Sequence, residues 1–129
     1  MINILMLFVV CLTFGVLSVN AANINFETAY SQSDKIPMVT LVYAKWADNY
    51  QSAINIFREI PKEFTGNYNF VEMDIATPDA KYYNNRYNIY PKLPHVLVHK
   101  EGGKFFRFIP NECATDYSCL VSKLKIFIQ

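Results

Sequence analysis

Three cysteines carry the most reactive side chains of this sequence: Cys11, Cys113 and Cys119. A cysteine attacks a substrate or exchanges a disulfide as its thiolate, whereas two nearby cysteines can form a structural bridge. Cys11 lies in an apolar N-terminal segment, and five residues separate Cys113 from Cys119. A bridge is feasible if Cys113 lies in the loop before a helix that carries Cys119, because their α-carbons then come within disulfide range. We expect this bridge and keep two unpaired thiols as the alternative.

Two histidines and a few neighbouring carboxylates are the other candidates for binding a metal or moving protons. His95 and His99 share one face of an expected strand, but the nearest acid, Glu101, lies in the following turn. Zinc sites need three or four such ligands, so we expect no metal. We also expect no cofactor and no catalytic residue. The carboxylates fall on an alternating strand or in a helix first turn, and we interpret them as solvated charges and caps: Glu72, Asp74 and Asp79.

The composition excludes several classes of protein. The chain has 129 residues, of which 52% are hydrophobic and 16% aromatic, so it is too apolar to be disordered and long enough for one domain. Its 12 Lys and Arg residues are balanced by 11 Asp and Glu residues and do not cluster. This charge pattern does not fit a protein that binds nucleic acid or an anionic membrane surface.

The N-terminal segment is predicted to be a signal peptide. Residues 1–19 carry no charged side chain, and the apolar run over 4–17 is short for a membrane span. Val19 and Ala21 are residue types found three and one before a signal-peptidase cut. We therefore expect a signal peptide over 1–21, then a single domain over 22–129 without a membrane span. Such a protein is secreted or resides in the endoplasmic reticulum lumen, and both locations stay open.

The rest of the chain alternates strand and helix patterns. The near-continuous apolar run over 38–44 is typical of a central strand that is buried on both faces. Thr77, Pro78 and Asp79 have the residue types that begin a helix. We predict, in order, a strand over 24–26, a helical turn over 27–32, a strand over 38–44, a helix from Asp48 or Asn49 that Pro61 kinks or ends, a strand over 68–75, a helix after Thr77, a hairpin over 95–109 and a helix with an apolar stripe over 120–128.

Two stretches carry a family resemblance. Residues 41–46 read as an apolar strand that ends in Tyr-Ala-x-Trp, and residues 93–103 read as a proline, a strand and a glycine turn. In this order and spacing they resemble the thioredoxin-like superfamily, in particular domains of the protein disulfide isomerase family. The resemblance covers residues 24–128. It implies an α/β thioredoxin-like fold, with a central mixed sheet of four to five strands flanked by helices.

The family's reactive residues are missing from the matching positions. The resemblance implies a Cys-x-x-Cys pair where this chain has Ala47 and Tyr50, with Asp48 and Asn49 between them. It also implies a buried acid where this chain has Leu41. Disulfide exchange needs one thiolate that attacks and a second sulfur that resolves the mixed disulfide. We therefore expect a redox-inactive domain rather than an enzyme.

Other parts of the family's site persist. The resemblance implies a cis bond between Leu93 and Pro94, with the backbone of Leu93 available to pair with an extended chain beside Trp46 and Tyr50. We therefore expect a chaperone-like or adaptor domain that binds peptide or protein partners in the secretory pathway. The alternative is that Trp46 and Pro94 persist only because the fold packs around them.

Two other functions stay open. An atypical disulfide oxidoreductase or isomerase could use Cys113 and Cys119, although we expect Cys119 inside the last helix, away from a helix N-terminus that would lower its pKa. A small subunit of a luminal complex is a third reading, similar to the thioredoxin-like subunits of oligosaccharyltransferase, but those carry membrane spans. Four tyrosines could line a partner surface, although core packing explains most of them: Tyr82, Tyr83, Tyr87 and Tyr90.

Overall fold

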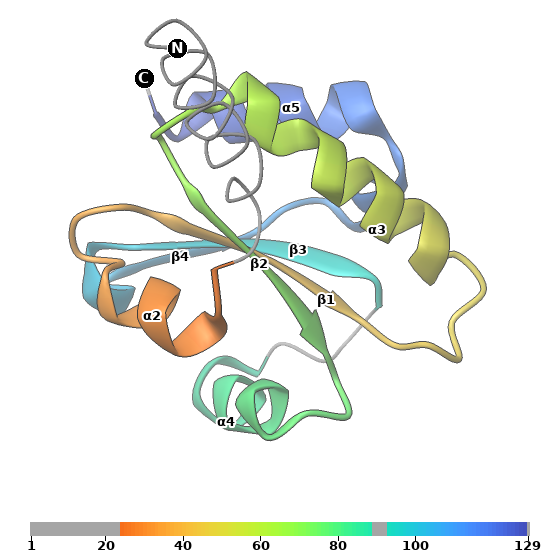
Figure 1. Ribbon diagram of the computed structural model, residues 1–129, viewed down its shortest axis with the longest axis horizontal. Coiled ribbons are helices and arrows are strands. Elements are labelled where there is room, and N and C mark those ends of the chain that lie inside the picture. Colours follow the sequence, from red (N-terminus) through yellow and green to blue (C-terminus); the bar gives the residue numbers. More distant parts are fainter. Residues whose placement is uncertain (1–23, 89–92, 129) are drawn as a thin grey trace, which may run out of the picture.

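Four strands form one mixed sheet in the order β2-β1-β3-β4 (Figure 1). The strands are β1 (Met38–Tyr43), β2 (Asn69–Asp74), β3 (His95–Lys100) and β4 (Phe105–Phe108). β1 pairs with β2 in parallel and with β3 in antiparallel orientation, and β3 and β4 form a hairpin. This computed structural model describes residues 24–88 and 93–128, and it confirms the predicted α/β class. The predicted signal peptide, Tyr90 and Pro91 lie outside the described residues.

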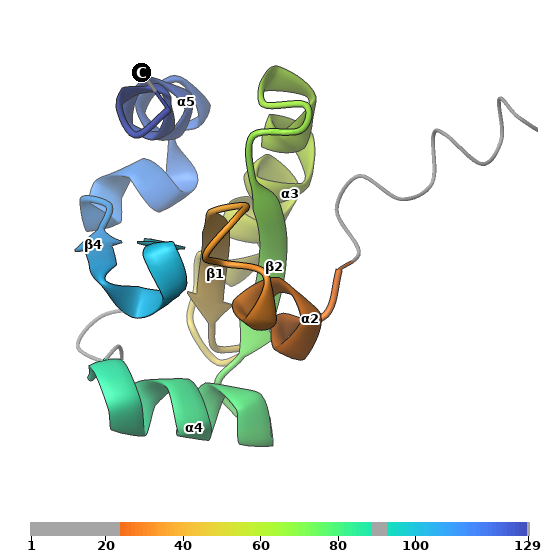
Figure 2. The same cartoon turned by 90° about the vertical axis from the view of Figure 1, so that its left-hand side faces the viewer.

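Helices cover both faces of the sheet (Figure 2). On one face lie α3 (Tyr50–Glu59) and α5 (Tyr117–Ile126), and on the other lie α2 (Phe26–Ser31) and α4 (Pro78–Tyr87). Short 3₁₀ helices follow α3, connect β3 to β4 and precede α5: η1 (Ile60–Glu63), η2 (Glu101–Gly103) and η3 (Asn111–Thr115). Within residues 24–88 and 93–128, no helix has the length and apolar character needed to cross a membrane.

The central strand β1 contributes to two apolar cores because its side chains alternate between the faces of the sheet. Val39 and Leu41 pack in the core under α3 and α5, whereas Met38 and Val42 pack in the core under α2 and α4. The apolar run that predicted this strand is therefore explained by burial on both faces. β1 thus ends between two rigid layers, which fixes the start of the loop that follows it.

Local signals for helix ends were largely confirmed. The Thr77 hydroxyl accepts a hydrogen bond from the Ala80 N–H at the start of α4, and Pro78 is its first residue. Near Pro61, where we predicted a kink or an end of the helix, α3 ends at Glu59, and Pro61 lies in η1. Pro61 thus ends the regular helix, since it lacks the N–H that an α-helical bond requires.

The predicted strand over 24–26 is wrong. Asn25 instead caps α2, and its side-chain oxygen accepts a hydrogen bond from the Thr28 N–H at 2.8 Å. Phe26 and Ala29, three positions apart, then bury one face of the helix against the sheet. The alternation of apolar residues around Asn25 is compatible with a strand, but the cap and the helical burial favour the helix. β2 is consequently an edge strand within the described part of the chain.

Candidate functional site

The predicted site residues meet at one end of the sheet. β1 and β3 are antiparallel, and their register pairs Val42 with His95. Residues that leave β1 therefore lie next to residues that enter β3. This pairing brings the loop with Trp46 to the same end of the sheet as Leu93 and Pro94, although nearly fifty positions separate them in the sequence.

Trp46 lies in the turn between β1 and α3 and is 76% exposed. The turn is held by its backbone, since the Ala47 N–H donates to the Ala44 carbonyl at 3.0 Å. Beside it, the Lys45 ammonium lies 3.8 Å from the Asp74 carboxylate at the end of β2. An indole this exposed gains almost nothing from packing in the folded chain. Packing of the fold therefore does not account for Trp46.

Residues 47–49 complete the turn before α3, which begins at Tyr50, and residues 47–50 contain no sulfur. Ala47 is half-buried, Asp48 and Asn49 are exposed, and Asn49 precedes the helix without a side-chain cap bond. Tyr50 is half-buried and stacks on Tyr43, with ring centroids 6.1 Å apart and planes 13° apart. The sequence analysis did not single out Tyr43 as a partner of Tyr50. This stack holds Tyr50 against the core, so Tyr50 is less available to a ligand than Trp46 is.

Leu41 is fully buried among apolar side chains of α3 and α5. A carboxylate at this position would lose its hydration without a compensating partner, at a large cost in free energy. The region beneath residues 46–50 is therefore an apolar core rather than a place for a proton relay.

The peptide bond between Leu93 and Pro94 is cis, as the resemblance implies. Pro94 is buried, and the Asn111 side-chain amide donates a hydrogen bond to its carbonyl oxygen. Leu93 is half-buried against the core under α4, and no described residue forms a hydrogen bond with its backbone. Asn111 was missed by the sequence analysis because nothing in the local sequence marks a contact across 17 positions. Packing accounts for Pro94, in contrast to Trp46.

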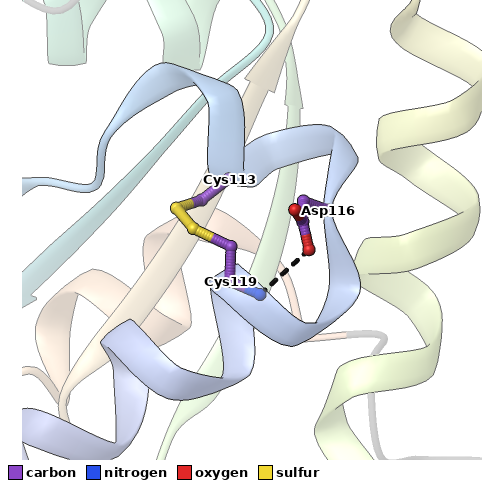
Figure 3. Close-up of a disulfide and its surroundings, with 3 residues drawn as sticks. All are labelled: Cys113, Asp116 and Cys119. Carbon is purple, nitrogen blue, oxygen red and sulfur yellow. Dashed lines mark hydrogen bonds between the residues drawn. A yellow bond between two sulfur atoms is a disulfide. The ribbon is translucent and has the colours of Figure 1, made fainter.

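The Cys113–Cys119 disulfide, predicted from the sequence, is present in the structure (Figure 3). It joins buried Cys113 in η3 to half-buried Cys119 in α5, with α-carbons 5.1 Å apart. The predicted position of Cys119 in the helix interior is wrong, because Cys119 is the third residue of α5. Asp116 begins the helix one turn before its apolar stripe, and its carboxylate accepts the Cys119 N–H at 3.0 Å.

The two histidines are packed against aromatic rings. His95 stacks on Phe108 with centroids 4.6 Å apart, and His99 is fully buried beneath Tyr30 and Tyr87. Burial lowers the pKa of His99 to about 4, and the positive charge of Arg86 adds to this effect. The described residues whose rings pack on these two imidazoles are thus aromatic.

Asp79 lies at a helix start, as expected, whereas Glu72 and Asp74, which we expected to be solvated charges, are partly buried in ion pairs. Glu72 forms a two-point salt bridge with Arg58 of α3, at 2.7 and 2.9 Å, and Asp74 lies beside Lys45. Asp79 lies in the first turn of α4. The hydrogen bond and charge of Glu72 raise the pKa of Arg58. These contacts are surface ion pairs and helix-end interactions.

Comparison with known proteins reveals similarity in fold but not in sequence. No family model matches this chain, and no curated protein sequence matches it. Several solved structures do match. Thioredoxin O2 from Arabidopsis thaliana in its oxidised state aligns over 81% of this chain and 87% of its own, with a TM-score of 0.60 and 17% identity. Oxidised thioredoxin from Plasmodium falciparum aligns over 81% and 90%, with a TM-score of 0.62 and 17% identity.

The fold is thioredoxin-like. The J-Trx1 fragment of ERdj5 gives the same result, with a TM-score of 0.62 and 13% identity over 80% of this chain and 47% of that fragment. The thioredoxin-like architecture explains why residues 46–50 and the Leu93–Pro94 bond lie at one end of the sheet. At these levels of identity the similarity concerns the fold, and the function has to be argued from the residues themselves.

Proposed function

We propose that this chain is a redox-inactive thioredoxin-like domain of the secretory pathway that binds extended peptide segments of protein partners, in a chaperone-like or adaptor role. The observation that carries the proposal is the exposure of Trp46 at the end of the sheet where the Leu93–Pro94 bond also lies. Large exposed aromatic side chains are unfavourable in water and are the residues that contribute most at binding interfaces.

The backbone of Leu93 supplies the second part of the proposed site. An extended peptide can pair with this backbone as an added strand, because main-chain hydrogen bonds do not depend on the peptide's sequence. Trp46 then covers one apolar side chain of the bound peptide. Tyr50, held by Tyr43, provides the edge of this surface rather than its centre.

Two features support a redox-inactive role, and two others support an oxidising compartment. Ala47 and Tyr50 provide neither an attacking nor a resolving sulfur, and Leu41 sits in an apolar core. The predicted signal peptide and the Cys113–Cys119 bridge both fit the secretory pathway, where disulfides persist.

Trp46 is the only tryptophan in the chain, so its fluorescence can test the binding proposal directly. The full chain is titrated with a blocked apolar heptapeptide, and with the same peptide N-methylated at alternate residues to remove backbone donors. We expect a saturable blue shift with the first peptide and a much weaker response with the second.

Calorimetry on variants completes this test. Trp46→Ala is expected to abolish binding of the heptapeptide, whereas Tyr82→Ala, which truncates another exposed aromatic residue, is expected to preserve it. Equal binding by the wild type and Trp46→Ala would show that the peptide does not use this surface.

A second candidate function is favoured by one observation. Cys119 lies in the first turn of α5, and a helix N-terminus lowers a thiol pKa. As an oxidoreductase, the bridge would accept two electrons from a substrate dithiol, which becomes a disulfide, and would be reduced to two thiols. Two features oppose this role: Cys113 is fully buried, and the Asp116 carboxylate beside Cys119 disfavours a second negative charge.

A dithiol probe separates the two functions. We expect the full chain to oxidise the probe no faster than a Cys113→Ser/Cys119→Ser variant, and the bridge to resist mild reductant in a mass measurement. Oxidation of the probe above that variant would establish the oxidoreductase instead.

A further inference from the structure

A second surface, distinct from the Trp46 region, lies between α2 and the N-terminal half of α4. The two helices lie on the face of the sheet opposite α3 and α5 (Figure 2). A cavity of about 300 Å³ opens between them. The residues that line it come from the two helices: Phe26, Glu27, Tyr30, Ser31, Asp79 and Tyr82. Only Tyr82 among them belongs to the group of tyrosines that the sequence analysis considered for partner binding.

Three aromatic rings form the walls of this cavity. The Tyr30 ring contacts both others, with its centroid 5.2 Å from that of Phe26 and 6.3 Å from that of Tyr82, and it is inclined to them by 55° and 71°. Phe26 is buried and Tyr30 is half-buried, so both are fixed by the core. Tyr82 is 54% exposed. The faces of such rings carry a partial negative charge, which attracts cations.

Two carboxylates add negative charge to the same cavity. Glu27 lies in the first turn of α2 and Asp79 in the first turn of α4. Neither carboxylate forms an ion pair with any residue in the described part of the chain. The nearby cation, Arg86, does not line the cavity, since its guanidinium donates to the Tyr87 hydroxyl and lies 5.7 Å from the Tyr87 ring centroid.

We propose that this cavity binds a lysine or arginine side chain of a partner polypeptide. Its aliphatic part would pack on Tyr30 and Tyr82, and its charged end would pair with Glu27 and Asp79. A purely apolar side chain fits less well, because it would cover two carboxylates without compensating their charge. Charge complementarity thus favours a basic side chain in this cavity. The Trp46 surface, by contrast, presents an uncharged indole.

A matched pair of peptides tests the charge requirement. The ¹⁵N-labelled full chain is titrated with blocked Gly-Arg-Gly-Arg-Gly, and with the same peptide carrying citrulline, a neutral analogue of similar shape, in place of arginine. We expect saturable amide shifts in the first turns of α2 and α4, with a dissociation constant of about 1 mM for the arginine peptide. Binding of the citrulline peptide is expected to be at least about tenfold weaker.

Variants localise the binding and separate it from the Trp46 surface. Tyr82→Ala and Glu27→Gln are expected to weaken the binding of the arginine peptide about three- to tenfold. Trp46→Ala and Glu112→Gln, which remove an exposed aromatic ring and an exposed carboxylate elsewhere, are expected to leave it unchanged. Equal affinity for both peptides, absence of shifts in α2 and α4, or loss of binding in Trp46→Ala but not in Tyr82→Ala would each overturn the proposal.

Discussion

At the scale of single residues, the most unusual side chain is that of His99. It is fully buried, its Nδ1 lies 3.3 Å from the Tyr83 hydroxyl, and its Nε2 has no hydrogen-bond partner among the described residues. Gly103 packs against the same ring, and a Cβ there would come within 2.7 Å of the Tyr87 hydroxyl and 3.4 Å of Nε2. His99 is therefore shielded from bulk water, and within residues 24–88 and 93–128 no acid forms an ion pair with it.

This burial predicts a loss of stability in mild acid. The pKa of His99 falls from 6.5 in the unfolded chain to about 4 in the folded chain, mainly through desolvation. Between these two values the unfolded chain binds a proton that the folded chain does not, so the free energy of unfolding decreases from about pH 6.5 to pH 4. Urea denaturation over this range should show a smaller decrease for His99→Gln than for the wild type.

The quantity to compare is the slope of the free energy of unfolding against pH. His99→Gln also loses the contact with Tyr83 and is therefore expected to be less stable at every pH. His95→Gln serves as the control and should retain the contribution of His99. If His99→Gln had the same slope as the wild type, His99 would not be the cause of the loss of stability in mild acid.

At the scale of elements, two interactions a few residues apart stabilise the start of α5. The Asp116 carboxylate caps the helix, and the Cys113–Cys119 bridge ties its first turn to η3. A bridge over so short a loop removes only a little conformational entropy from the unfolded chain. It stabilises the junction locally.

We expect reduction of the bridge, or the Cys113→Ser/Cys119→Ser variant, to lower the free energy of unfolding by about 2 kcal/mol. The measurement is urea denaturation with and without reductant, and the double variant should no longer respond to reductant. An unchanged midpoint for the reduced wild type would show that the bridge contributes no stability.

The far end of α5 is fixed by Tyr68, which lies just before β2. Its buried hydroxyl donates a 2.6 Å hydrogen bond to the Leu124 carbonyl, and burial raises its pKa to about 12. Tyr68→Phe should therefore cost about 1 kcal/mol in thermal or urea denaturation. Tyr82→Phe, which removes an exposed hydroxyl, should change stability much less. Equal effects of the two variants would indicate that the Tyr68 bond contributes nothing.

At the scale of the whole molecule, the two apolar cores are coupled through β1. Leu41 belongs to the core under α3 and α5, and Val42, the next residue, belongs to the core under α2 and α4. Loss of either core would expose one face of the strand that the other core needs. The sheet and its two helix layers should therefore unfold together.

Leu41→Ala tests this coupling. The variant leaves a cavity in a tightly packed core and should lower the free energy of unfolding by about 2 to 5 kcal/mol. Far-UV circular dichroism and Trp46 fluorescence should report one coincident transition, in the variant as in the wild type. Two separate transitions would mean that the cores unfold independently.

Much of this architecture could be predicted from the sequence because its signals are local. Strand positions followed from apolar runs, and the beginning of α4 followed from Thr77 and Pro78. The errors arose where two local signals compete. Around Asn25 a strand-like alternation competes with a helix cap, and at α5 the apolar stripe begins one turn later than its cap, Asp116.

The sequence by itself determined that residues 47–50 contain no sulfur and that position 41 carries no acid, because these are side-chain identities. It also predicted the disulfide and the α/β class. Only the tertiary structure decided that Trp46 projects into solvent while Pro94 is buried, and that Tyr30 and Tyr82 line one cavity with Glu27 and Asp79. Exposure and proximity depend on contacts between residues distant in sequence, which no local pattern records.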